Sequence, residues 1–451
     1  MGVMPVRKLL LAMSWPATLS MMIQALYNIV DSIFIAAVSE DALTAVTLVF
    51  PVQMLLISVG VGTGVGVNSL IARRLGAMRQ AEADLAAGVG FKLPLFSWAG
   101  FAFFGAFFSG IYFRAFSGNP YVVENGTKYL TLICLLSVFI LMWTCIEKII
   151  QATGNMVLPM ICGLSGAVLN IALDPIFIFG YFGVPRLEVF GAAIVTVISQ
   201  FTTFSLGLIF LFGKKHDVRI RLREHKINKS TLKEIYAVGL PAILMQSLGS
   251  VMLFCLNGIL SAISATAVAV LGAYFRLQSF IFLPTFGVMQ GAMPIMGYNF
   301  GAKNKKRLMS TFFNAFGISF SIMLLGLFLF QVFPHQLLAM FSASDQMLSI
   351  GVSALRLISL SFPMAAFGII ASTLFQAIGN GMLSLWGNLI RAIIGVVPIA
   401  WILAHTESGV FLVWAAFPMA EVLGVIFCMI ALLYIYKKKI KHLGVQEAIL
   451  K

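Results

Sequence analysis

Long apolar runs alternate with short polar segments along almost the whole chain. A helix needs about 20 apolar residues to cross the ~30 Å hydrocarbon core of a bilayer. Twelve runs meet this length, at roughly 9–38, 44–72, 88–113, 128–152, 157–180, 189–212, 234–260, 266–298, 311–333, 349–377, 383–403 and 410–436. The pattern predicts an all-α integral membrane protein with twelve transmembrane helices. Ten-residue segments of alternating polarity, which would indicate a membrane β-barrel, are not seen.

Several of these runs are longer than a membrane span requires, so the sequence predicts tilted or kinked helices. Prolines inside the runs are the candidate kink positions: Pro16, Pro51, Pro241 and Pro284. The first run follows two basic residues, as in a signal peptide. It is too long for one and has no small-residue cleavage site, so we predict an uncleaved first helix.

The composition narrows the class of protein. Hydrophobic residues make up 60% of the 451 residues and charged residues only 10%, against about 25% charged in soluble proteins. This excludes a soluble enzyme, a disordered chain and a nucleic-acid-binding domain. The five cysteines lie in apolar runs without metal-ligand spacing, so they are predicted to be core residues. No Walker A, metalloprotease or serine-hydrolase motif is present, and we predict no catalytic residues and no cofactor.

The basic residues are concentrated in alternate connecting segments. By the positive-inside rule these segments face the cytoplasm, which places both termini of the multi-pass protein there. The net charge of +14 therefore sets orientation and attracts anionic membrane lipid, and no nucleic-acid partner is needed to explain it. On the cytoplasmic side we count 22 of the 30 basic residues: Arg7, Lys8, Arg73, Arg74, Arg79, Lys214, Lys215, Arg219, Arg221, Arg223, Lys226, Lys229, Lys233, Lys303, Lys305, Lys306, Arg307, Lys437, Lys438, Lys439, Lys441 and Lys451. The opposite segments hold Arg114, Lys128 and Arg186.

The second half of the sequence repeats the first at a constant offset. Gln-Ala-Thr-Gly-Asn at 151–155 recurs as Gln-Ala-Ile-Gly-Asn at 376–380, and Pro16 matches Pro241, an offset of 225 (241 minus 16). Further matches at this offset are Gln53 with Gln278, Gly76-Ala77 with Gly301-Ala302, and Phe116-Ser117 with Phe341-Ser342. Because each half has an even number of spans, the halves enter the membrane in the same direction. We predict two parallel six-helix bundles, 1–213 and 234–451, joined by a basic cytoplasmic linker at 214–233. Duplicated bundles are typical of transporters but also occur in channels and flippases.

Three short motifs resemble the multidrug and toxic compound extrusion (MATE) family. They are the repeated Gln-Ala-x-Gly-Asn, the Tyr-Asn-Ile-Val-Asp stretch at 27–31, and Gly64-x-Gly66-x-Asn68. The segment at 170–175, with Asp174 before Pro175, is similar to the DinF-like and MepA-like bacterial branch, which carries a second acid there. The NorM-like branch would instead carry acids in spans seven and ten. The resemblance covers essentially the whole chain and implies cation-coupled antiport of drug-like compounds.

Asp31 is the clearest candidate for coupling, because charge at membrane depth costs at least ~2.5 kcal/mol. Gln24, Asn28 and Asp31 share one helix face. Counted from the outer ends of their spans, Asp31, Asp174 and Thr196 all lie ~10 Å deep. Asn170 and Ala192 are each one turn away, from Asp174 and Thr196 respectively. We therefore predict that these residues form one coupling site in the N-terminal half.

The side chains proposed for this site are hard oxygen ligands of the kind that a small cation prefers. Pro175 has no N–H, so the carbonyl of Ile171 also becomes available. Two carboxylates close together repel each other, and either a shared proton or Na⁺ would relieve the repulsion. The alternative is a purely structural hydrogen-bond network between helices, which is common for Asn and Thr in membranes.

In the C-terminal half, Glu421 occupies the position that matches Thr196 in the repeat. Arg276 lies at a similar depth, so the two are predicted to form a structural ion pair, while Arg391 has no predicted role. The residues predicted to line a substrate cavity are Gln24, Asn28, Asn68, Gln246, Asn257 and Gln290.

These observations predict a monomeric secondary antiporter that exports amphipathic, often cationic, organic compounds in exchange for H⁺ or Na⁺. A flippase for a lipid-linked precursor, from the same wider superfamily, is the alternative, and it would be expected to have more than twelve spans. A membrane-embedded enzyme is disfavoured because no nucleophile and base are found together. A channel is disfavoured because neither half contains a filter-like motif.

Overall fold

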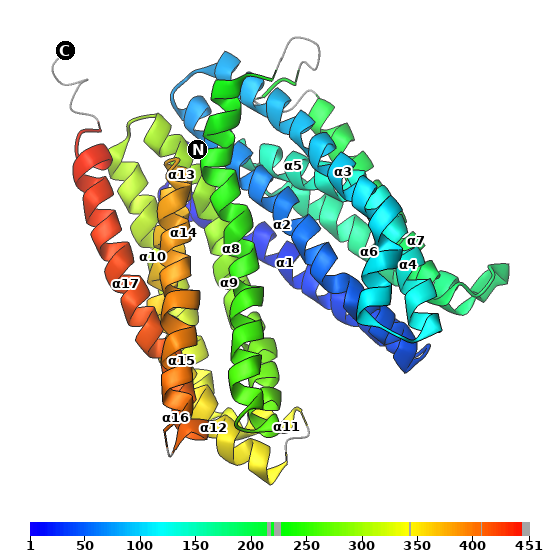
Figure 1. Ribbon diagram of the computed structural model, residues 1–451. Helices are drawn as coiled ribbons and strands as arrows, with labels where there is room; N and C mark the ends of the chain where they lie inside the picture. The colour runs from blue at the N-terminus through cyan, green and yellow to red at the C-terminus, as the bar shows by residue number, and fades with distance from the viewer. Residues whose placement is uncertain (214–217, 221–226, 342–343, 407, 444–451) are drawn as a thin grey trace, which may run out of the picture. The chain divides into compact units, whose positions relative to one another are not determined.

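A computed structural model describes residues 1–213, 218–220, 227–341, 344–406 and 408–443, and these form helices and their connections (Figure 1). Ten helices are long and apolar enough to cross a membrane, and two bent helix pairs bring the number of spans to as many as twelve. No strand occurs in these described ranges. The prediction of an all-helical protein with twelve spans is confirmed.

The first half of the chain begins with three long helices and continues with four shorter ones. The fourth predicted span is made of two helices, α4 and α5. Asn119 caps α4 by accepting a hydrogen bond from the backbone N–H of Tyr121, and Pro120 begins the helix. The bounds are α1 Val6–Ala36, α2 Glu40–Gly76, α3 Gln80–Phe116, α4 Pro120–Leu135, α5 Val138–Ala152, α6 Val157–Phe179, the short η1 Tyr181–Gly183, and α7 Glu188–Phe212.

The second half has the same order of long helices. The eleventh span of the chain is interrupted by a π-helical segment. The bounds are α8 Lys229–Ser261, α9 Ala265–Gly301, α10 Lys305–Val332, α11 Pro334–Ala339, α12 Asp345–Ser359, α13 Phe362–Ala377, α14 Gly381–Leu389, η2 Ile390–Val396, α15 Val397–Ala404, α16 Gly409–Leu412, η3 Val413–Ala415, α17 Ala416–Ile435 and η4 Tyr436–Ile440. The short α11 lies between α10 and α12, whereas the first half has no helix between the equivalent α3 and α4.

Two spans are sharply bent, and they are equivalent in the repeat. The bend is 45° between α4 and α5 and 46° between α12 and α13. The first helix of each pair starts at Pro120 or Asp345, which are matching positions of the two halves. The four prolines predicted to kink helices lie inside unbroken helices instead. The breaks therefore occur where two short helices meet.

The helices are grouped into two compact units. The N-terminal unit comprises Leu19–Arg74 and Arg79–Ile243, and the C-terminal unit comprises Met1–Thr18, Leu75–Met78 and Leu244–Lys451. The first parts of α1 and α8, up to Thr18 and Ile243, thus belong to the unit formed mainly by the other half of the sequence. The functional boundaries predicted at 213 and 234 stay a prediction.

In the N-terminal unit, the first part of α8 packs directly on glycines of α2. A Cβ atom added at Gly66 would collide with the carbonyl oxygen of Ile235 and lie 3.0 Å from the backbone nitrogen of Gly239. One added at Gly62 would collide with the side chain of Ile243. Glycine at these two positions therefore allows a close approach of the two helices.

The C-terminal unit repeats this packing with α1 in place of α8. A Cβ atom at Gly287 of α9 would collide with Thr18, and one at Gly291 would lie 2.7 Å from the Oγ of Ser14. Gly287 and Gly291 are the repeat equivalents of Gly62 and Gly66. The duplicated sequence thus produces the same glycine-mediated helix contact in both units.

Charged residues at the ends of the helices hold neighbouring helices of the N-terminal unit together. Arg74 at the end of α2 pairs with Glu82 of α3, and its Nη2 lies 2.8 Å from Oε1 and 2.9 Å from Oε2 of Glu234 in α8. The backbone N–H of Arg219 donates to Asp84 of α3 over 2.9 Å. The predicted cytoplasmic bases Lys214, Lys215, Arg221, Arg223, Lys226 and Lys451, and Ser342 of the repeat, lie outside the described residues.

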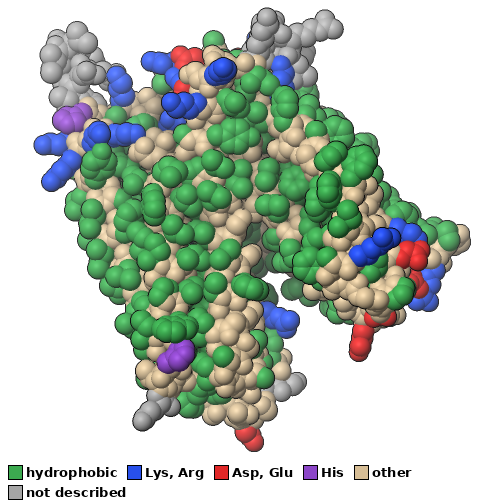
Figure 2. All heavy atoms as spheres, viewed as in Figure 1, with side chains coloured by type: hydrophobic (Ala, Val, Ile, Leu, Met, Phe, Trp, Pro, Cys, Tyr) green, Lys and Arg blue, Asp and Glu red, His purple; other side chains and the backbone are tan. Residues whose placement is uncertain are grey.

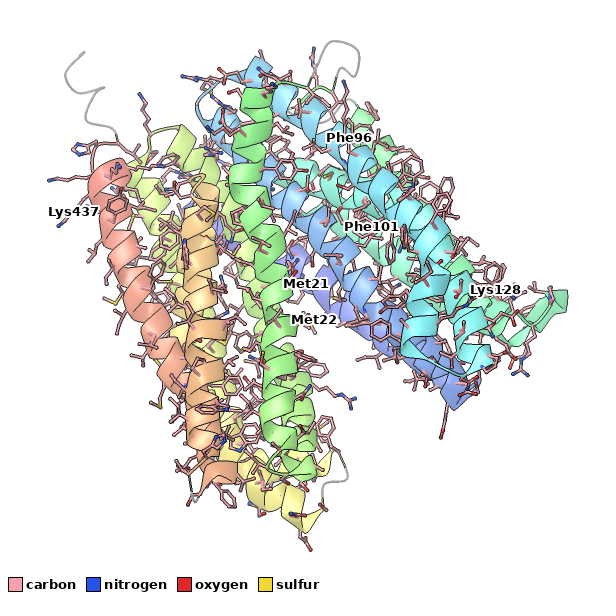
Figure 3. The ribbon with its side chains drawn as sticks, in the orientation of Figure 1. Met21, Met22, Phe96, Phe101, Lys128 and Lys437 are labelled. Atoms are coloured by element: carbon pink, nitrogen blue, oxygen red, sulfur yellow. The ribbon has the colours of Figure 1, made fainter. Side chains whose placement is uncertain are left out.

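The surface along the helices is mainly hydrophobic, with the basic side chains gathered towards the helix ends (Figure 2). Large exposed side chains include Phe96 of α3, which is 66% exposed. Figure 3 shows Phe96 and Phe101 along α3, with Lys128 in α4 and Lys437 just after α17. This is the distribution expected of helices whose sides face lipid and whose ends face water.

Candidate functional site

Asp31 and Asp174 are brought together in the N-terminal unit from α1 and α6. Asp174 is completely buried, and it lies close enough to Asp31 to interact with it electrostatically. Asp31 is partly buried. The sequence predicts that the two acids lie at the same depth in the membrane. In the structure they are also close enough for their charges to interact.

The acidic side chains have oxygens with no hydrogen-bond partner. Both carboxylate oxygens of Asp174, the Oδ1 of Asp31 and the Oδ1 of Asn170 are buried and accept no hydrogen bond. A buried polar atom without a partner is costly and is rare in native proteins. These oxygens are therefore available to bind a proton or to coordinate a small cation.

Two tyrosines that were not among the predicted site residues complete this cluster. The Tyr129 hydroxyl from α4 interacts with the side chains of Gln53 and Thr196, while Tyr129 also feels the charge of Asp31. The Tyr27 hydroxyl interacts with the side chain of Gln24 and with both acids. Tyrosines within apolar runs give no periodic signal, although Tyr27 is the first residue of the motif at 27–31.

The other predicted coupling residues belong to the same unit and differ in burial. Asn170 is buried one turn before Asp174, and Ala192 is completely buried in α7. Thr196, one turn after Ala192, is half-buried and contacts Tyr129. Ala192 therefore provides tight packing, while Thr196 provides a hydroxyl group. Their roles in coupling stay a prediction.

The Gly64-x-Gly66-x-Asn68 motif has a structural explanation. A Cβ atom at Gly64 would lie 2.7 Å from the Cγ of Lys148, so glycine leaves room for this lysine. The Asn68 side chain donates to the backbone carbonyl of Lys148 over 2.9 Å. Asn68 is only 2% exposed. The Asn68 amide therefore joins α2 to α5, and its predicted role in lining a substrate cavity stays a prediction.

Lys148 is a buried base that is hydrogen-bonded to the first residue of the repeated Gln-Ala-x-Gly-Asn motif. Its Nζ donates to Gln151 over 2.9 Å and lies 3.3 Å from the carboxylate of Glu147. Gln151 in turn donates to Glu147 over 2.6 Å. Glu147 and Lys148 therefore form an ion pair, and the repeated glutamine is part of the same network.

The remaining predicted cavity residues differ in exposure. Gln24 and Asn28 are exposed on α1, Gln246 is exposed on α8, and Asn257 and Gln290 are half-buried. The role of all five residues in substrate binding stays a prediction.

Glu421 in the C-terminal unit has a different partner from the predicted one. Its Oε1 lies 3.5 Å from Nη1 of Arg391, whereas Arg276 is exposed and forms no described ion pair. The predicted Arg276–Glu421 pair is therefore wrong. Arg391 reaches Glu421 because its stem passes over Gly424, one turn away on α17, where an added Cβ would lie 3.3 Å from the arginine Cβ.

The described residues contain no group of three or more His, Cys, Asp or Glu side chains that could hold a metal ion. Two acids with free oxygens can take up and release a proton, or can hold a monovalent cation with help from neighbouring amide and hydroxyl oxygens. This chemistry suits ion binding rather than bond breaking.

Comparison with known proteins places the chain in a family. The MatE family model matches residues 16–176 and again 241–402, and the two matches start at Pro16 and Pro241, which are equivalent in the repeat. The multidrug export protein MepA of Staphylococcus aureus (strain MSSA476) is 26% identical over 427 residues, covering 90% of this chain and 91% of that protein. The probable multidrug resistance protein YoeA of Bacillus subtilis (strain 168) is 26% identical over 433 residues, covering 94% and 93%.

A solved structure agrees with these relatives. It is described as the outward-facing conformation of a multidrug resistance MATE family transporter of the MOP superfamily, with a TM-score of 0.88, 28% identity and 97% coverage of both chains. The family match, the relatives and the shared fold agree with the motifs in the sequence. The chain therefore belongs to the multidrug and toxic compound extrusion family and is a multi-pass membrane transporter.

Proposed function

We propose that this protein is a secondary antiporter that exports amphipathic, often cationic, organic compounds in exchange for H⁺ or Na⁺. The observation that carries the proposal is the set of buried, unpartnered oxygens on Asp31, Asp174 and Asn170. Two carboxylates and an amide oxygen in one buried cluster can take up a proton or hold a small cation, which is what an ion-coupling site requires. The multidrug export proteins among its relatives support the substrate class.

The coupling follows from the charge of the two acids. When both are ionised, they repel each other and attract a cation or water. When a proton or Na⁺ is bound, the repulsion falls and α1 can repack around Asp31, with Pro16 as a weak point in the helix. To change the population from 1:99 to 99:1, the two states must differ in ion affinity by about 5 kcal/mol.

We further propose that the protein is a monomer in the bacterial cytoplasmic membrane, with both termini in the cytoplasm. The asymmetric distribution of the basic residues supports this orientation. The halves 1–213 and 234–451, joined by the linker at 214–233, would be the two functional halves. Export then runs against the drug gradient at the expense of an inward ion gradient.

Transport in membrane vesicles tests this function. Efflux of a fluorescent organic cation is measured with a pH gradient alone, with a Na⁺ gradient alone and with neither. We expect one of the two gradients to drive efflux in the native protein and neither to drive it in Asp31→Asn. Asp41→Asn is the matched control, because Asp41 is an exposed acid at the start of α2.

The test also separates the alternative functions. If neither gradient drives export of any organic cation while a labelled lipid-linked precursor crosses the membrane, the protein is a flippase and the proposal fails. If Asp31→Asn retains the native gradient-driven rate at equal expression, the proposed site is wrong even though the protein transports drugs.

A further inference from the structure

The C-terminal unit contains a second charged site, formed by Arg391 and Glu421. Arg391 lies in the π-helical segment η2, and Glu421 lies on α17. The Arg391 Nη2 also donates to Oδ1 of Asn388 in α14 over 3.0 Å. Tyr274 of α9 interacts electrostatically with both charged residues. Helix segments widened to π geometry often occur at functional sites, where they re-aim a side chain.

Several helices of this unit border the site. Asn388 donates to the Oγ of Ser372 in α13 over 3.4 Å and to the sulfur of Met245 in α8 over 3.2 Å. Gly368 of α13 faces Glu421, whose Oε1 is the only atom within 4 Å of a Cβ built at this glycine. Helices α8, α9, α13 and α17 thus contribute to its surroundings, and there is free space at Gly368.

The geometry of this pair differs from that of a structural ion pair in the same protein. Arg74 reaches both oxygens of Glu234 at 2.8 and 2.9 Å although the Glu234 side chain is 35% exposed. Glu421 is only 8% exposed, yet it has a single contact of 3.5 Å with Arg391. A buried carboxylate gains most from short, two-pronged contacts. Arg391 thus holds Glu421 by one long contact rather than by the short, two-pronged contact that joins Arg74 and Glu234.

Arg391 also has unused hydrogen-bonding capacity. A guanidinium has five N–H donors, and within the described residues those of Arg391 reach only Glu421 and Asn388. Its side chain is 28% exposed even though its stem packs on Gly424. The cationic end of the side chain is therefore accessible within the unit.

We propose that Arg391 and Glu421 form a binding site for the two charged groups of an amphipathic zwitterion. A carboxylate of the ligand would bind Arg391, and a cationic amine would bind Glu421. A ligand with only one charged group would separate the pair and leave the other residue buried without a counter-charge, which is strongly unfavourable. A zwitterion replaces both partners at once, so the charge within the unit stays balanced.

This inference rests on the proposed export function and specifies a substrate class for it. The repeat shows that the site is peculiar to the C-terminal unit, because the positions that match Arg391 and Glu421 in the first half are Gly166 and Thr196. The N-terminal unit has two acids without a base beside them, which suits cations. The C-terminal unit adds a base to one acid, which suits a molecule with both charges.

Three fluorescent probes test the proposal by equilibrium binding to the purified full-length protein. Dansyl-lysine is a zwitterion, its methyl ester is a cation, and dansyl-glycine is an anion. We expect the native protein to bind dansyl-lysine about tenfold more tightly than the methyl ester or dansyl-glycine. This is the gain in affinity expected from one additional charge-assisted hydrogen bond. Equal affinity for the three probes, or a preference for the ester or the anion, would overturn the proposal.

Variants of Arg391 and Glu421 then test whether these two residues cause the preference for dansyl-lysine. Arg391→Gln leaves Glu421 without a counter-charge and can fail to fold, so the decisive variant is Arg391→Gln combined with Glu421→Gln. We expect this double variant to bind dansyl-lysine about tenfold more weakly and the ester within about twofold of the native protein. The matched control is Arg356→Gln, which removes an exposed positive charge from the same unit. It should keep the preference for dansyl-lysine.

Failure of this inference can be told apart from failure of the proposed function. If the ester is exported in response to an ion gradient but the double variant loses the ester and dansyl-lysine equally, only the zwitterion site is wrong. If the native protein exports none of the probes under either gradient, the export function fails first. A preference for dansyl-lysine that survives in the double variant would also reject the site.

Discussion

The two units are products of one repeat, yet they treat buried charge in opposite ways. In the N-terminal unit, Asp31 and Asp174 have no basic partner among the described residues. The matching positions of the second half are Leu256 and Ile399, so the acids are replaced by aliphatic residues. The C-terminal unit instead holds an arginine and a glutamate side by side.

This difference shows that the fold does not determine the electrostatics of its interior. Both units keep the same helix order, the same bent span and the same glycine-mediated helix contacts. Uncompensated acids bind a proton or a cation strongly and must change state when it leaves. A compensated pair has no net charge, so it can be structural or can bind a balanced ligand.

The largest expected effect comes from removing the base of the C-terminal pair. Arg391→Gln should lower the free energy of unfolding by about 3 kcal/mol, because it leaves Glu421 buried without a counter-charge. Asp31→Asn should have the opposite or no effect, because it removes a charge that has no partner. Thermal unfolding of the two detergent-purified variants measures both changes.

The double variant Arg391→Gln with Glu421→Gln is the control for this contrast. Removing both charges should restore most of the lost stability. If Arg391→Gln is as stable as the native protein, the pair is already hydrated and the contrast between the units disappears.

A second prediction addresses what the two units share. Gly66→Ala and Gly291→Ala should each lower stability by about 2 kcal/mol, because the added methyl group meets the neighbouring helix. Gly66 should be the more sensitive, since its methyl group would approach the backbone of α8 more closely than a methyl group at Gly291 would approach α1. Gly258→Ala is the control, with nothing within 4 Å of the added atom. A control variant that unfolds as readily as Gly66→Ala would show that helix packing is not the cause.

The smallest expected effect concerns the hydroxyl group at the N-terminal position that corresponds to Glu421. Thr196→Val should cost about 1 kcal/mol, because it removes one interaction with Tyr129 and preserves the shape of the side chain. Denaturation of the purified variant would measure the change. An effect as large as that of Arg391→Gln would mean that Thr196 is as important structurally as the ion pair, and would weaken the contrast between the units.

Much of the fold can be predicted from the sequence, because hydrophobic length and the constant offset between matching motifs are strong signals. The sharp bends could not be placed, since prolines such as Pro16 and Pro51 are accommodated inside continuous helices. The bend between α4 and α5 falls at Leu136 and Ser137, which carry no distinctive signal. Tertiary packing decides where such a span breaks.

The candidate site could be predicted in part. Asp31 and Asp174 stand out because acids are rare in apolar runs, and counting residues gives their depth. Helix rotation is harder to predict, and this is why the sequence pairs Glu421 with Arg276 rather than with Arg391. Arg391 shares the unit with Arg276, and only the packing of its stem on Gly424 shows which of the two reaches the acid.

The central claim is that ion coupling belongs to the acids of the N-terminal unit and not to Glu421. Ion movement per exported organic cation is measured directly in proteoliposomes that contain native protein, Asp31→Asn or Glu421→Gln, at equal protein content. We predict that Asp31→Asn abolishes coupled ion movement, while Glu421→Gln keeps the native ratio of ions to cations. Loss of coupling in Glu421→Gln together with intact coupling in Asp31→Asn would contradict the account.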